Sequence, residues 1–221
     1  MAQEPLRTPF ILACYQVYLT DGDSARFVRD IALRYSVPTL KRLTGSHFAP
    51  TRRAASLALG ILADRNAIPC LGPMLSDADR AVRLIADDAI KAIWSRAASP
   101  VGRGLLDNIV AKLAEEDYAS ARREAERLVT IHPTLPEAFC QRALALYADG
   151  EVEAAIADCE RAIEVNAFEY MAYVGLGQCH LELEQPRIAL DHFRQAIAIY
   201  PDLEPVHLQI RKLEESLREI T

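Results

Sequence analysis

The sequence has no apolar run that approaches the roughly 20 consecutive residues a transmembrane helix requires, so no membrane span is expected. It holds only 9 glycines and 12 prolines and no Ser- or Gly-rich tract, which argues against extensive disorder. Strand-forming residues rarely alternate with polar ones, so a half-buried sheet is not expected either. The abundance of Ala, Leu, Arg and Glu, with 51% hydrophobic residues overall, favours an all-α protein with a sizeable core.

The five cysteines are scattered and never spaced as CxxC, which argues against a disulfide framework or a zinc site. A reduced cysteine at an apolar helix position acts as a small hydrophobic residue. The apolar stretch at residues 9–13 is too short for the central region of a signal peptide. These features together predict a reducing compartment, and we expect the protein in the cytoplasm.

Motifs for common chemistry are also missing, since the sequence has no phosphate-binding loop, Rossmann glycine pattern, GxSxG or HExxH. His180, His192 and His207 on neighbouring predicted helices are the best candidates for a metal site, but no two histidines share a helical face at ligand spacing. The acidic pair Asp87 and Asp88 falls on a predicted helix exterior, where carboxylates are solvated. We therefore expect no catalytic residues, no metal and no cofactor.

The net charge of −6 hides a difference between the two halves of the chain. Residues 1–100 hold 13 Lys and Arg against 9 Asp and Glu, a net +4, whereas residues 101–221 hold 12 against 22, a net −10. Such a split suggests two modules with different partners, although two solvated surfaces would equally explain it. Basic residues are not interleaved with aromatic ones, so no nucleic-acid binding is expected.

The C-terminal half repeats itself with a period of about 34 residues. Ala143 and Gly177 occupy equivalent positions, where a small side chain lets the two helices of one repeat approach closely, and bulky residues such as Phe193 fill the gaps. Gly150 can adopt the left-handed conformation that ends the first helix of its repeat. Residues 202–221 mix apolar and charged side chains, as a capping helix with one face in water requires.

These residues resemble the tetratricopeptide repeat family. The resemblance is strong in residues 136–166 and 170–201, and weaker in residues 105–133, where Ile109 replaces the usual small residue. It implies three repeats and a C-terminal capping helix over residues 102–221. The family's fold is an α-solenoid of antiparallel helix pairs, whose first helices line a concave groove that binds a protein or peptide.

The resemblance also assigns groove residues by position. These are Leu106, Val110, Gln141, Leu144, Tyr147, Val174, Gln178, Leu181 and Lys212. Chaperone-binding members of the family hold a C-terminal carboxylate with Lys and Asn, but Leu106, Val110 and Gln141 stand at those places here. The two-carboxylate clamp is therefore absent, and the groove would suit an extended or helical apolar segment. Packing of some of these residues against neighbouring helices is the alternative.

The N-terminal half has a different, slightly shorter period. Pro38 recurs as Pro69 and Arg52 as Arg83, and each proline stands where the first turn of a helix tolerates it. The pattern resembles the short form of the HEAT repeat family, over about residues 20–97. In that family an Asp in the turn and an Arg on the second helix form a ladder, and Asp64, Arg52 and Arg83 match those places.

We therefore expect a HEAT-like module in residues 1–98 and a tetratricopeptide array in residues 102–221, separated where residues 95–104 interrupt the helical pattern. The leading interpretation is a non-catalytic protein–protein interaction scaffold or adaptor, not an enzyme. One alternative is an enzyme or enzyme accessory, because short HEAT-like repeats occur in bilin chromophore lyases, but this rests on fold analogy alone. Another alternative is self-association into a structural solenoid.

Overall fold

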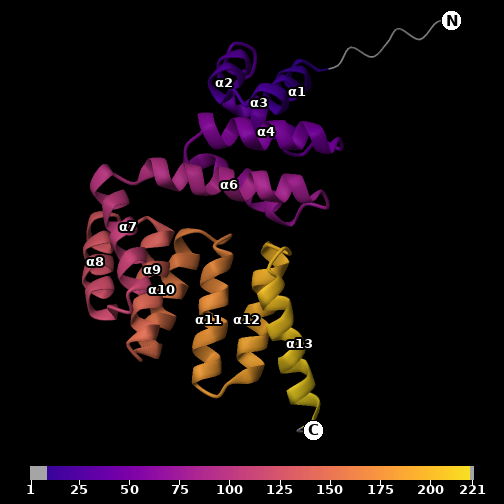
Figure 1. The fold of residues 1–221 in the computed structure, drawn as a ribbon. Coiled ribbons are helices and arrows are strands. Elements are labelled where there is room, and N and C mark those ends of the chain that lie inside the picture. The colour runs from indigo at the N-terminus through magenta and orange to yellow at the C-terminus, as the bar shows by residue number, and fades with distance from the viewer. Residues whose placement is uncertain (1–8, 220–221) are drawn as a thin grey trace, which may run out of the picture. The chain divides into compact units, whose positions relative to one another are not determined.

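The computed structural model describes residues 9–219, which form thirteen α-helices, two short 3-10 helices and, within that range, no strand (Figure 1). The all-α prediction is confirmed. The chain divides into two compact units, Met1–Trp94 and Ser95–Thr221, and each is described by itself. Of the helices in the described part of the chain, none combines the length and apolar character needed to cross a bilayer.

The first unit is built from short helix pairs that follow the shorter period. Its elements are α1 (Phe10–Asp21), α2 (Ser24–Ala32), α3 (Val37–Leu43), α4 (Ala49–Leu62), η1 (Arg65–Ala67), α5 (Ile68–Leu71), η2 (Gly72–Ser76) and α6 (Arg80–Ala97). The pairs α3/α4 and α5/α6 begin at equivalent positions, with Pro38 and Pro69 in the first turns of α3 and α5. Helix α5 gives way to η2 after one turn because Pro73 has no N–H to donate to a preceding carbonyl.

Two arginines of α4 hold the loop that precedes α6. Arg52 donates from Nε and Nη2 to the two carboxylate oxygens of Asp77, at 2.6 and 2.7 Å. Arg53 pairs in the same way with Asp79, which also accepts the backbone N–H of Val82 and so caps α6. The pKa of Asp79 is lowered to about 2. The hydrogen bond from Arg53 is the largest cause, and the backbone hydrogen bond from Val82 acts in the same direction. The start of α6 is therefore fixed to α4 by two charged pairs.

The HEAT-like resemblance assigns Asp64, Arg52 and Arg83 to the ladder, and the structure places Asp77 rather than Asp64 against Arg52. Asp64 lies two residues after the end of α4 and accepts the backbone N–H of Asn66, so it caps η1. Asp77 lies in the turn of the next helix pair, within reach of Arg52, and Arg83 donates to the backbone carbonyl of Asp77 at 2.8 Å. Arg52 ties two successive turns together through Ser46 and Asp77, and Arg83 donates to the turn of its own helix pair. The HEAT-like resemblance itself stays a prediction.

The second unit consists of three helix pairs and a final helix. They are α7 (Pro100–Ala114), α8 (Tyr118–Ile131), α9 (Pro136–Ala148), α10 (Val152–Val165), α11 (Tyr170–Glu182), α12 (Pro186–Ile199) and α13 (Glu204–Glu219). Helices α8, α10 and α12 begin at equivalent positions of the predicted repeat, as do α9 and α11. Val206 and Ile210 of α13 pack against Phe193 of α12, so α13 covers the apolar face of the last pair.

The break predicted over residues 95–104 is wrong in its extent, because only residues 98 and 99 are outside helices. Ser99 caps α7 by accepting the N–H of Gly102 at 3.1 Å, and both its N–H and its hydroxyl donate to Nε2 of His132. A Cβ on Gly102 would lie 2.5 Å from that nitrogen. The glycine therefore allows a close packing contact and does not break the helix.

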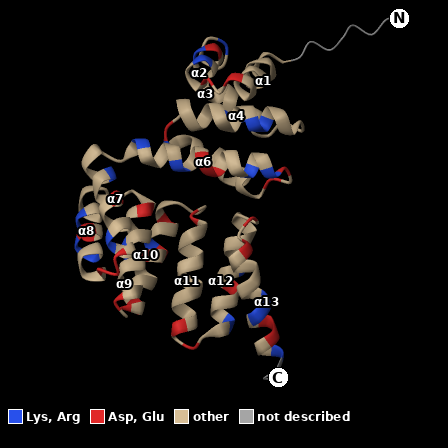
Figure 2. Ribbon diagram, viewed as in Figure 1, with Lys and Arg blue, Asp and Glu red and all other residues tan. Residues whose placement is uncertain are grey.

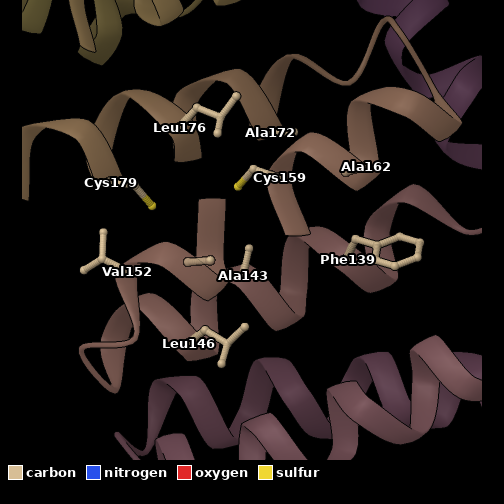
Figure 3. Close-up of a cluster of buried hydrophobic side chains, with 10 residues drawn as sticks. Phe139, Ala143, Leu146, Val152, Cys159, Ala162, Ala172, Leu176 and Cys179 are labelled. Atoms are coloured by element: carbon tan, nitrogen blue, oxygen red, sulfur yellow. The ribbon is translucent and has the colours of Figure 1, made fainter. Parts of the chain in front are cut away.

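Two equivalent positions lie in the core of each helix pair of this unit, and in the first and third pairs a large side chain at one position is matched by a small one at the other. The residues at these positions are Ile109 and Ala125 in the first pair, Ala143 and Cys159 in the second, and Gly177 and Phe193 in the third. A Cβ on Gly177 would lie 2.4–2.7 Å from ring atoms of Phe193, which is fully buried. Figure 3 shows the core cluster around Ala143 and Cys159. A small residue on one helix thus makes room for a larger one on its partner.

The turn inside each pair has a residue in the left-handed conformation at the same position of the repeat. Glu116, Gly150 and Glu184 have φ of 59°, 83° and 56°, and they occupy the same position in successive repeats. The predicted left-handed conformation of Gly150 is therefore present, and it is a property of the repeat. Only Gly150 adopts it without steric cost, because Cβ crowds the following carbonyl in the other two.

Candidate functional site

A cavity of about 290 Å³ opens between α9, α10 and α11. Most of its wall comes from four positions of the repeat, each supplied once by α9 and once by α11. These pairs are Glu137 and Met171, Cys140 and Val174, Gln141 and Gly175, and Leu144 and Gln178. Ala143, Tyr147, Cys159, Ala172 and Cys179 complete the lining. The cavity forms because successive first helices present the same face, which is a consequence of the repeat.

Three thiols line the cavity: Cys140, Cys159 and Cys179 (Figure 3 shows the last two). Burial raises the pKa of Cys159 to about 12 and that of Cys179 to about 11. Burial also raises the pKa of Cys140, and the neighbouring carboxylates of Glu169 and Glu137 raise it further. All three are uncharged near neutral pH, so they act as small apolar groups and not as nucleophiles.

The rim of the cavity exposes large apolar side chains. Leu144 is 51% and Met171 is 50% exposed, and they come from neighbouring first helices. Gln141 donates from Nε2 to Glu137, while its Oε1 is buried and accepts no hydrogen bond within the described chain. A buried acceptor without a donor is costly, so this atom is available to a donor that enters the cavity.

Five of the nine predicted groove residues line this cavity. They are Gln141, Leu144, Tyr147, Val174 and Gln178. They meet because α9 and α11 are in contact and carry the same register. Their part in binding stays a prediction.

The other four predicted residues lie outside the cavity lining. Leu106 and Val110 are on α7, where Val110 is 56% exposed. Leu181 is half-buried and packs against the core cluster that α12 and α13 share. Lys212 is exposed on α13. The groove implied by the family resemblance runs along the whole array, whereas the cavity is confined to the second and third repeats.

The sequence-based assignment missed several wall residues, most clearly Glu137, Met171 and Gly175. Gly175 stands at the same repeat position as Gln141, so completing the predicted register would have found it. Glu137 and Met171 are equivalent to each other and lie one turn before Gln141 and Gly175, so the predicted face had to be extended by one turn to include them. Gly175 also has a packing role, because a Cβ there would lie 2.7 Å from Sγ of Cys159. Cys179 belongs to a hydrophobic core cluster, and its place in the cavity wall was not predicted.

The histidines do not assemble into a metal site. His180 and His192 stack with ring centroids 5.2 Å apart, whereas Nε2 of His207 donates to the carbonyl of Pro201. Burial, followed by the neighbouring His180, lowers the pKa of His192. Among residues 9–219, no group of three or more His, Cys, Asp or Glu is placed to hold a metal ion.

The tetratricopeptide repeat family model matches residues 136–168 and 172–203, which are the second and third helix pairs. The first such domain of Spaghetti (RPAP3), solved with the HSP90 peptide SRMEEVD, is 19% identical, with a TM-score of 0.51 over 55% of this chain and 96% of that one. The Sgt2 domain from Aspergillus fumigatus is 21% identical, with a TM-score of 0.53 over 55% and 82%. These two structures share the fold of the array. The helix pairs that form the cavity are therefore tetratricopeptide repeats.

Proposed function

We propose that this protein is a non-catalytic adaptor that binds an apolar segment of another protein in the cavity between α9 and α11. The observation that carries the proposal is the apolar cavity itself, with uncharged thiols in its wall and Leu144 and Met171 half exposed at its rim. Contiguous apolar surface that faces water marks interaction sites in soluble proteins. The uncharged thiols suit a reducing compartment, and we place the adaptor in the cytoplasm.

An acidic C-terminal peptide is not the expected ligand. The Spaghetti domain binds SRMEEVD, whose charge and terminal carboxylate need cationic partners. No Lys or Arg lines the present cavity, and its single charged wall residue is Glu137. Gln141 stands at a place where carboxylate-binding members of the family have Lys or Asn. The apolar wall and the buried acceptor of Gln141 instead favour a segment with apolar anchors and a free N–H.

Site-specific photo-crosslinking in cells tests this proposal. A benzophenone side chain at position 144 or 171 should form an adduct with the same partner, because both positions border one cavity. The matched control is position 127 on α8, where the Arg127 side chain is 61% exposed. Adducts that are no more abundant from positions 144 and 171 than from position 127 would refute the proposal. An adduct of twice the chain mass would show that the partner is a second copy.

A further inference from the structure

The two helices that form the cavity walls carry almost no positive charge. Helix α11 contains no Lys or Arg, and α9 contains only Arg142 (Figure 2). Arg142 is already engaged, because its Nε and Nη2 donate to both carboxylate oxygens of Asp158 at 2.7 and 2.6 Å. An anionic group that entered the cavity would find no free cation on either wall.

Negative charge lies at both ends of the same cavity. Glu137, in the first turn of α9, lines it, and Glu169 lies at the N-cap of α11. Beyond the other end, Glu182 is the last residue of α11, one turn past the wall residue Gln178. Glu137 and Glu182 form no ion pair with any residue in the described part of the chain. Their charges are therefore available to a ligand.

The pKa values of two wall residues are consistent with this arrangement. After burial, the largest effects that raise the pKa of Cys140 are the charges of Glu169 and Glu137. At the other end, burial and then Glu182 raise the pKa of Tyr147. Cys140 and Tyr147 lie two turns apart on α9, which is about 10 Å along the helix axis. The apolar stretch between the acidic ends is thus about two helical turns long.

We infer that the segment bound in this cavity is apolar in its centre and carries Lys or Arg on both sides of that centre. The inference rests on the proposed function and names the chemistry of its ligand. The apolar centre would contact Leu144 and Met171, while the flanking cations would lie near Glu137 and Glu182. The net charge of −10 on residues 101–221 would also attract a basic segment over a longer range.

A display selection tests the inference with a defined probe, a library of random 16-residue peptides panned against the full chain. We expect enriched peptides with apolar residues in the centre and Lys or Arg on both flanks. Acidic or uncharged flanks would overturn the inference. If the enriched peptides bind the Leu144→Ala/Met171→Ala variant as tightly as the native chain, the proposed function fails as well, because binding then lies elsewhere. A selection that enriches nothing counts against both.

A charge-reversal comparison then measures the electrostatic part. A synthetic enriched peptide should bind about tenfold more tightly than the same peptide with Glu in place of its flanking basic residues, because each carboxylate contributes a modest screened attraction. The Glu137→Gln/Glu182→Gln variant should remove most of this difference. The control Glu204→Gln/Glu215→Gln, with the same change of charge on α13, should retain it. Equal ratios for the two variants would overturn the inference and leave the cavity as the binding site.

Discussion

The two units of this chain fix the register of their helices by different means. In the first unit, Arg52 and Arg53 of α4 form paired hydrogen bonds with Asp77 and Asp79 in the loop before α6. In the tetratricopeptide pairs of the second unit, small and large apolar side chains exchange places between the two helices of each repeat. The first device is electrostatic and lies at the start of a helix. The second is steric and lies between helices, although Arg142 of α9 also forms a charged pair with Asp158 of α10.

The difference has a functional consequence. The charged tie of α9 joins Arg142 to Asp158 of α10, and no Lys or Arg lines the cavity between α9 and α11, so the cavity wall is largely apolar. We therefore expect a change of size at Gly177 to affect the second unit, and a loss of charge at Arg52 or Asp79 to affect the first. The single tryptophan, Trp94, belongs to the first unit and reports on it by fluorescence, whereas circular dichroism reports on all helices.

Gly177→Ala should have the largest effect, because its Cβ would overlap the ring of the buried Phe193. Overpacking of this kind costs about 3 kcal/mol of unfolding free energy. Urea titration should show early loss of circular dichroism with little change at Trp94. Phe193→Cys in the same chain recreates the pairing of the second repeat, so the double variant should lose less than the sum of the single changes. Simple additivity would contradict the steric account.

Arg52→Met should come next and act on the other unit. Asp77 would keep its buried carboxylate but lose both arginine hydrogen bonds, at a cost of about 2 kcal/mol for a partly shielded pair. The urea midpoint followed by Trp94 fluorescence should fall. Arg29→Met is the control, because the Arg29 side chain is 68% exposed and its loss should cost little. Equal effects of the two changes would argue against the charged tie.

Acid should loosen the first unit through Asp79. Its pKa is about 2 when folded, below its ordinary value of 3.8, so its stabilising effect is complete above about pH 4 and is lost as pH falls toward 2. Arg53→Met removes the main cause of this shift. Between pH 6 and pH 3, the native chain should lose about 1 kcal/mol more than the variant. Parallel pH profiles of the two proteins, followed by Trp94 fluorescence, would contradict this assignment.

The smallest effects should come from the left-handed turn positions, which compare repeats within the second unit. Gly150→Ala forces a Cβ into the left-handed region and should cost about 1 kcal/mol. Glu184→Gly removes that strain from the third repeat and should stabilise it by about 0.5 kcal/mol. Thermal unfolding monitored by circular dichroism measures both. The same sign for the two changes would show that the turn does not control stability.

Much of the fold follows from periodicity, because the regular recurrence of small residues such as Ala143 and Gly177 marks helix pairs that must pack closely. Contacts between side chains distant in the sequence were harder to predict. Asp64 and Asp77 both follow helices and look alike in the sequence, and only the packing of α4 shows that Asp77 reaches Arg52. Likewise, the glycine at position 102 looked like a helix breaker, but a histidine far along the chain requires its small size.

The cavity was predictable as a helical face but not in its depth. Leu144 and Gln178 follow from the register, whereas Leu181 has the same spacing and is instead covered by the packing of α12 and α13. Whether an apolar residue faces a cavity or a neighbouring helix depends on tertiary packing, which the repeat pattern does not encode. The acidic residues Glu137 and Glu182 were not predicted, because carboxylates near helix ends are common and do not by themselves indicate a cavity.

The methionine methyl groups offer the most direct test of the binding cavity. The chain has three methionines, of which Met171 lies at the cavity rim and Met74 in the first unit. With 13C-labelled methyl groups, titration with a peptide enriched by display should shift or broaden the Met171 signal and leave the Met74 signal in place. An unchanged Met171 signal at saturating peptide would contradict the central claim that α9 and α11 form the binding site.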